Sequence, residues 1–422
     1  MNHKSGFWKI FMGSSFVTFV NMLRAFAVNK LLAVFLSPSM FACIAQFVNF
    51  MNVGQAFSSL SLQNGWVSLT AQNKDNLEKL HGVWRGGIRL TTFASVFTFV
   101  VMVIAAFILP LDTLLPGIPS RLSQAAIIFA LPGIFAMNVI TISASVMNGL
   151  HDYRRWGLIN VVSSVWQILW VAFFLYTGHL SVLSVIATQS IVCALFAMRI
   201  ASRAGFSFKK IRASLIDLRS PWISFALMGI LPMVMTPVVL TFIRSTVGLS
   251  FGWNAAGIWQ GIWKISDFFA AGFSAILGVI VLPKVNSGMG RIEFFRWFDG
   301  ILLRIMGVSF LVAATVYFLR YFVVSLFLSK AYAGAVDYML PQLVGDFFRS
   351  GGWALGLVLV ARRETKIFLA TEMVALLFLA IASVAGMKIF GFYGPMFAYA
   401  CENFIYFVAL FVVVRRLKWN IR

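Results

Sequence analysis

Residues 90–110 read LTTFASVFTFVVMVIAAFILP and contain no charged side chain. About 20 apolar residues in a helix are enough to cross the hydrocarbon core of a bilayer. The same pattern continues along the chain, since 60% of the 422 residues are hydrophobic, 11% are charged, and the mean hydropathy is +0.90. Water-soluble domains are far less apolar. The sequence therefore predicts an integral membrane protein.

Twelve apolar stretches are bounded by charged residues, proline or glycine. We expect each to form a transmembrane helix, which predicts an all-α polytopic protein with little chain left for a soluble catalytic domain. The predicted helices span 8–36, 40–70, 84–110, 122–148, 156–176, 180–202, 221–248, 254–283, 294–320, 336–361, 365–387 and 392–414.

The Lys and Arg residues in the connections and at the ends of these spans predict the topology. One set of alternate connections, which includes both termini, holds 24 of them, and the other set holds five, namely Arg121, Arg244, Arg320, Lys330 and Lys388. Cytoplasmic connections retain positive charge. We therefore expect both termini in the cytoplasm.

The formal net charge of +21 in a soluble protein would suggest nucleic acid as a partner. Here the topology and attraction to anionic lipid account for it, so we expect the lipid bilayer and no nucleic acid. The cysteines and histidines have no metal-ligand spacing, and no GxxxxGK[ST] phosphate loop occurs. We predict no metal, no cofactor and no enzymatic activity.

The basic segment FSFKKIRASLIDL (206–218) lies midway along the chain. Its apolar residues recur at helical spacing opposite Lys209, Lys210 and Arg212, which is typical of an interfacial amphipathic helix, although an ordinary basic linker fits equally well. Either form predicts three parts: an N-terminal six-helix lobe (1–203), a cytoplasmic linker (204–220) and a C-terminal six-helix lobe (221–422).

The two lobes share a weak internal repeat. An offset of 214 residues places Lys30 over Arg244 and Gln46 over Gln260. Transporters are often built from such repeats, with the binding site between them. We include Lys30, Gln46 and Gln260 among the candidate substrate-binding residues.

Five cations fall inside the predicted spans. A charge at the centre of a membrane helix costs roughly 2.5 to 3.5 kcal/mol on insertion scales, so we expect these side chains to face water or one another. Snorkelling to the headgroups is the alternative for those near helix ends, Lys30 and Arg304. The five cations are Arg24, Lys30, Lys264, Arg304 and Arg349.

Two acids accompany these cations at helical spacing. Lys264 and Asp267 are three residues apart, as are Asp346 and Arg349, so each pair shares a helix face and could neutralise itself. Arg24 has no such neighbour. Together the cations suggest a wet, net-positive cavity shared by the lobes, suited to phosphate because the planar guanidinium donates two hydrogen bonds at once.

Glu372 and Glu402 have no cation three or four residues away. A carboxyl group buried in hydrocarbon without a cationic partner readily binds a proton. Both are therefore candidates for ion coupling, and a protonated structural acid is an equally good interpretation.

Four segments carry a resemblance to a known family: GIWQGIWKISD (257–267), Leu282-Pro283, QLVGD (342–346) and NKLLAV (29–34). These segments and their order along the chain resemble those of the bacterial polysaccharide-lipid flippases. These comprise the O-antigen and enterobacterial common antigen lipid III flippases of the MOP superfamily, which also contains the multidrug MATE exporters.

The resemblance implies two six-helix bundles related by a pseudo-two-fold axis. It implies transport of an undecaprenyl-diphosphate-linked oligosaccharide from the cytoplasmic to the periplasmic leaflet of the inner membrane by alternating access. A polysaccharide polymerase and a chain-length regulator are candidate partners. The alternatives are a MATE-like cation or drug antiporter and a non-transporting subunit of a glycan assembly complex.

Overall fold

The computed structural model describes residues 3–115, 118–178, 181–206, 221–285, 290–362 and 364–417. These residues form helices joined by short turns, and no strand occurs among them. The predicted amphipathic linker lies almost wholly outside the described residues. The helices, including the short 3-10 segments η1 and η2, are α1 (His3–Phe35), α2 (Pro38–Ser59), α3 (Gln63–Asn73), α4 (Leu77–Ile108), α5 (Leu111–Leu114), α6 (Ser120–Gly149), α7 (Tyr153–Thr177), α8 (Val182–Thr188), α9 (Ile191–Arg203), α10 (Pro221–Phe251), α11 (Trp253–Val285), α12 (Arg291–Phe318), α13 (Arg320–Phe327), η1 (Lys330–Tyr338), α14 (Met339–Ala361), α15 (Thr365–Phe390), η2 (Gly391–Tyr393) and α16 (Gly394–Arg416).

Each of the twelve predicted stretches coincides with helix in the structure, so the all-α polytopic fold is confirmed. Within the described residues, nine segments are long and apolar enough to cross a membrane by length and composition. One of them, Thr365–Arg416, contains both α15 and α16.

Two predicted stretches are divided in the structure, and one cation lies elsewhere than predicted. The stretch 40–70 breaks between α2 and α3, because Leu60 and Ser61 adopt φ angles of 50° and 53°, which end a right-handed helix. The stretch 180–202 likewise divides into α8 and α9. Arg244, which we expected in a translocated connection, lies inside α10 and is only 1% exposed.

The chain divides into two compact units. The first comprises Met1–Leu31 and Cys43–Val238, and the second comprises Leu32–Ala42 and Val239–Arg422. The division therefore falls inside α10, whereas the predicted lobes meet at the linker. The start of α2 belongs to the second unit, where a Cβ atom at Gly257 of α11 would lie 1.9 Å from the carbonyl oxygen of Pro38.

In the first unit α6 is the central helix and packs against α3, α4, α7, α8 and α9. Its apolar core includes a cluster of large aromatic side chains, in which Trp66 contacts Trp222 and Phe206. Some polar side chains within this unit hydrogen-bond to one another, which lowers the cost of burying them in a membrane. For example, Asn138 donates a hydrogen bond to the Ser58 hydroxyl at 2.6 Å.

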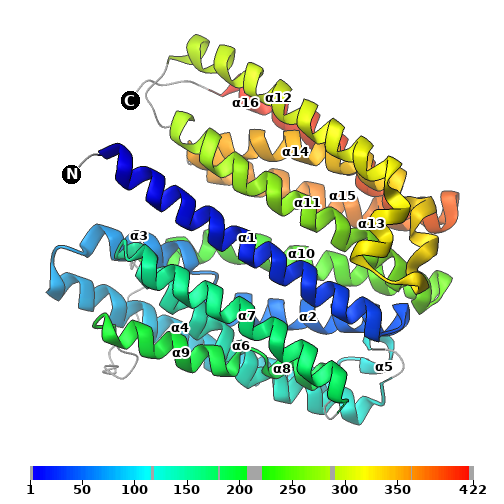
Figure 1. The fold of residues 1–422 in the computed structure, drawn as a ribbon, viewed down its shortest axis with the longest axis horizontal. Coiled ribbons are helices and arrows are strands. Elements are labelled where there is room, and N and C mark those ends of the chain that lie inside the picture. Colours follow the sequence, from blue (N-terminus) through cyan, green and yellow to red (C-terminus); the bar gives the residue numbers. More distant parts are fainter. Residues whose placement is uncertain are drawn as a thin grey trace. The chain divides into compact units, whose positions relative to one another are not determined.

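In the second unit α14 is the central helix, and Figure 1 shows it in orange running alongside α11 and α16. Close approach is possible because α14 presents glycines to its neighbours. A Cβ atom at Gly345 would lie 2.3 Å from the ring of Tyr399 on α16, and one at Gly352 would lie 2.8 Å from Tyr406. Gly345 thereby fixes where the Tyr399 ring can sit.

Candidate functional site

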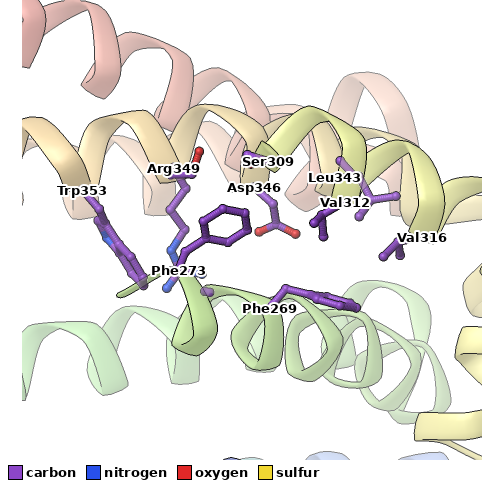
Figure 2. Close-up of a pocket in the computed structure, with 12 residues that line it drawn as sticks. Phe269, Phe273, Ser309, Val312, Val316, Leu343, Asp346, Arg349 and Trp353 are labelled. Atoms are coloured by element: carbon purple, nitrogen blue, oxygen red, sulfur yellow. The ribbon is translucent and has the colours of Figure 1, made fainter. Parts of the chain in front are cut away.

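A pocket with about 400 Å³ of empty space, part of it open to the surroundings, lies within the second unit between α11, α12 and α14. Its walls are mostly apolar and aromatic, and Figure 2 shows the Asp346 and Arg349 side chains among them. The lining residues are Phe269, Ala270, Phe273, Ser309, Val312, Ala313, Val316, Leu343, Asp346, Arg349, Ser350 and Trp353. A mostly apolar pocket with a few convergent polar groups is typical of a ligand site.

The Asp346 carboxylate is held by two hydroxyl groups from neighbouring helices. Ser266 of α11 donates to Oδ2 at 2.7 Å, and Tyr399 of α16 donates to Oδ1 at 2.8 Å. The Tyr399 ring is itself fixed against Trp263, with ring centroids 5.1 Å apart. Asp346 is therefore a rigid acceptor rather than a free carboxylate.

Arg349 is positioned from three sides. Its Nη1 donates to the Tyr399 hydroxyl at 3.2 Å and lies 3.7 Å from Oδ1 of Asp267. Its guanidinium carbon lies 4.4 Å from the centre of the Trp353 ring, a cation–π contact. The tyrosine hydroxyl thus bridges Arg349 and Asp346 by accepting from one and donating to the other.

Lys264 completes the cluster, with its Nζ 3.8 Å from Oδ2 of Asp267. The sequence allowed Arg349 to pair with Asp346 on its own helix, but its ion-pair partner in the structure is Asp267 on α11. The i, i+3 rule identified the helix face correctly but not the partner, because Ser266 and Tyr399 satisfy Asp346. Neither hydroxyl carries a sequence signal, so both residues were absent from the predicted site.

Glu372 and Glu402, for which the sequence offers no cation three or four residues away, are hydrogen-bonded to neutral groups. Tyr406 donates its hydroxyl hydrogen bond to Glu372, and Asn403 donates to Glu402 at 2.7 Å. Glu402 and Tyr406 also line a second cavity of about 620 Å³ between α15 and α16, otherwise formed almost entirely by apolar side chains. This environment resembles the one expected for a carboxyl group that takes up a proton.

In the first unit, Arg24 of α1 donates from Nη1 to Oε1 of Gln167 on α7 at 2.9 Å. One turn earlier on α1, Asn21 accepts from the Ser164 hydroxyl at 2.8 Å. The partner of Arg24 is therefore a neutral amide, which leaves its positive charge without a counterion in this contact.

The remaining predicted site residues lie elsewhere. Gln260 is 2% exposed and accepts from Nε of Arg244 at 3.0 Å, so its amide oxygen is occupied by a structural contact. Gln46 is 3% exposed, and Lys30 is half-buried on α1. Arg304 is exposed on α12 and does not line the cavity. The structure thus brings together Lys264, Asp267, Asp346 and Arg349, two cations and two acids.

Comparison with known proteins places this arrangement in context. No protein-family profile matches the chain. Over 397 residues it is 24% identical to the lipid III flippase of Escherichia coli, and equally to that of Shigella flexneri, covering 92% of this chain and 94% of each relative.

Solved transporter structures share the fold. An inward-facing multidrug resistance MATE transporter of the MOP superfamily superposes with a TM-score of 0.74 at 16% identity, covering 94% of both chains. A lipid II flippase in an inward closed conformation gives 0.73 at 13% identity, covering 96% of this chain and 87% of the other. The resemblance predicted from the sequence is thus matched by lipid III flippases at 24% identity, and the chain has the fold of these solved transporters.

Proposed function

We propose that this chain, which has the MOP-superfamily fold, translocates an undecaprenyl-diphosphate-linked oligosaccharide from the cytoplasmic to the periplasmic leaflet of a bacterial inner membrane. Its similarity to lipid III flippases along 92% of its length supports this substrate class. The proposal includes alternating access as the mechanism, cytoplasmic termini, and a polysaccharide polymerase and chain-length regulator as partners.

The observation that carries the proposal is the position of the Arg349 guanidinium and the few hydrogen bonds that it makes. Its guanidinium lines an apolar cavity, yet among the residues that the structure describes its one hydrogen bond is to the Tyr399 hydroxyl. Arginine has five N–H donors in a planar fork that matches the oxygens of a phosphate group. A diphosphate entering this cavity would find free donors already held in place by Trp353.

Arg24 offers a second anion-binding group in the first unit. A cation inside a membrane helix is costly, and it is retained where it contacts water, an anion or a polar path. Because Gln167 supplies only a neutral oxygen, the Arg24 contact does not cancel the charge. We assign Arg24 and Arg349 to the diphosphate, with Lys30 and Lys264 as supporting cations.

The proposed transport lowers the cost of removing water from the polar headgroup of the substrate. Moving a diphosphate and several sugars through hydrocarbon would strip their polar groups of water without replacing the hydrogen bonds. The few polar groups of the cavity, above all the Arg349 guanidinium, supply such bonds to the diphosphate, while the polyisoprenyl chain stays in the lipid. For energy coupling we propose Glu372 and Glu402, which are bound to the neutral donors Tyr406 and Asn403.

The test is glycan export in a strain whose own flippase has been deleted. Arg24→Ala and Arg349→Ala should each abolish complementation while the protein remains in the membrane at normal abundance. Arg296→Ala is the matched control, because Arg296 is exposed on α12 outside the cavity. Full complementation by both cavity variants would contradict the assigned roles.

Cation or drug antiport is the second candidate. Phe269, Phe273 and Trp353 line the cavity beside Asp346, an arrangement that also fits an aromatic cation. Efflux of ethidium from vesicles containing the purified chain would favour this function, whereas the nearby Arg349 opposes it.

A further inference from the structure

We propose that Asp267 is an internal competitor of the substrate: its carboxylate occupies Arg349 and Lys264 in the empty protein and leaves them when a diphosphate binds. This inference rests on the proposed function and adds a specificity-determining residue to it.

The contacts of Asp267 are those of a replaceable counterion. Its two oxygens lie 3.7 Å from Arg349 and 3.8 Å from Lys264, so each oxygen faces a different cation. Both separations exceed the usual hydrogen-bond length of about 3 Å. The side chain is 37% exposed, so water can reach it and solvate the carboxylate once it is displaced.

Asp346 provides the contrast within the same cluster. Its oxygens accept hydrogen bonds of 2.7 Å and 2.8 Å from Ser266 and Tyr399. Displacing Asp346 would therefore break two short hydrogen bonds, whereas displacing Asp267 separates two longer ion pairs of 3.7 Å and 3.8 Å. Of the two acids, Asp267 is the one that a ligand can replace.

The cation that Asp267 would release does not depend on Asp267 for its position. Arg349 keeps its hydrogen bond to Tyr399 and its contact with Trp353. The Arg349 guanidinium would therefore remain directed at the cavity with a vacant side. Diphosphate oxygens can then take the place that the carboxylate oxygen held, with shorter and charge-assisted hydrogen bonds.

This exchange discriminates between anions by charge. A ligand gains the two cations only if it outcompetes a carboxylate that is already present at very high local concentration. A diphosphate carries more negative charge than a monophosphate and can engage Arg349 and Lys264 together. The competitor should therefore favour diphosphate-linked substrate over a monophosphate carrier lipid.

The experiment measures binding of inorganic pyrophosphate and inorganic phosphate to the purified full chain by titration calorimetry. Asp267→Asn should bind pyrophosphate about fivefold more tightly than the native chain, because a carboxylate at this distance opposes the ligand by about 1 kcal/mol even when the dielectric is that of water. The same variant should prefer pyrophosphate over phosphate less strongly. Arg349→Gln should lose most of the pyrophosphate binding.

Two further variants separate competition from general effects. Asp337→Asn removes the same charge from an exposed position in η1 and should leave both affinities unchanged. Asp346→Asn should bring a smaller gain in affinity, since Asp346 is bound to its hydroxyl partners and does not occupy the cations as Asp267 does. Asp267→Ser is a second substitution at the competitor position, and the thermal unfolding of each variant confirms that it is folded.

Unchanged or weaker pyrophosphate binding by folded Asp267→Asn and Asp267→Ser would overturn the inference, as would an equal gain from Asp346→Asn. If the native chain binds pyrophosphate and restores glycan export, either result would overturn the competitor role alone. If no variant binds pyrophosphate, the competitor role fails, and loss of glycan export by the native chain would show that the proposed function fails as well.

Discussion

The hydroxyl group of Tyr399 holds the candidate site together, and Tyr399→Phe removes that single group. The substitution keeps the aromatic ring, so the contacts with Trp263 and Gly345 remain. It deletes the bond donated to Asp346 at 2.8 Å and the bond accepted from Arg349 at 3.2 Å.

The size of the effect follows from these two bonds. A hydrogen bond to a charged group contributes about 1.5 to 3 kcal/mol to stability. Asp346 keeps its hydrogen bond with Ser266, and Arg349 keeps its ion pair with Asp267 and its contact with Trp353, so both charged groups still have a partner. We therefore expect Tyr399→Phe to lower the free energy of unfolding by about 2 kcal/mol, which is less than the sum of about 3 to 6 kcal/mol for two such bonds because both charged groups keep other partners.

The assay is unfolding of the purified chain in detergent, run as a double-mutant cycle with Asp346→Asn. Groups that share a hydrogen bond show coupling energies of about 0.5 to 3 kcal/mol. The double variant should therefore lose less stability than the sum of the two single variants. Pyrophosphate affinity should also fall in Tyr399→Phe, because Arg349 loses the hydrogen bond that it donates to Tyr399.

The reasoning is refuted if Tyr399→Phe unfolds like the native chain, or if the two single effects simply add. Either result would mean that the tyrosine bridge contributes nothing beyond the packing of its ring. Phe407→Leu is a suitable comparison on the same helix, since it changes packing against α14 without touching the charged cluster.

Two further predictions concern packing and the first unit. Gly257→Ala should prevent normal accumulation in the membrane, because the new methyl group would clash with the backbone of Pro38, which cannot move aside as a side chain could. Immunoblotting of membrane fractions measures the abundance of the variant, and an abundance equal to that of the native chain would contradict the prediction. Arg24→Lys should retain only part of the glycan export, because an ammonium group lacks the planar set of donors with which Arg24 can bind both Gln167 and a phosphate. Export equal to that of the native chain would show that a positive charge alone is sufficient at this position.

The helices were predictable because hydropathy is a local property of the chain. Each of the twelve apolar stretches became helix, since burying backbone groups in lipid permits little else. The break at Leu60 and Ser61 was not predictable, because neither residue favours the left-handed conformation that it adopts. Tertiary packing imposes it there.

The candidate site was predictable in its charges but not in its connections. Lys264, Asp267, Asp346 and Arg349 stood out because ionised groups in apolar runs are rare. Their partners depend on which helices meet, and a tyrosine in an aromatic-rich helix gives no hint that it joins two charges. Arg244 shows the reverse error: it looked like a loop residue, but Gln260 and Trp259 stabilise it inside the protein.

The charge balance of this cluster has an electrical consequence. With all four groups ionised, Lys264 and Arg349 cancel Asp267 and Asp346, so the empty cluster carries no net charge. Each elementary charge moved across a membrane potential of about 100 mV gains or loses about 2.3 kcal/mol. Motion of the empty cluster through that field is therefore voltage-independent, and voltage acts on this part of the cycle only through the anion that it carries.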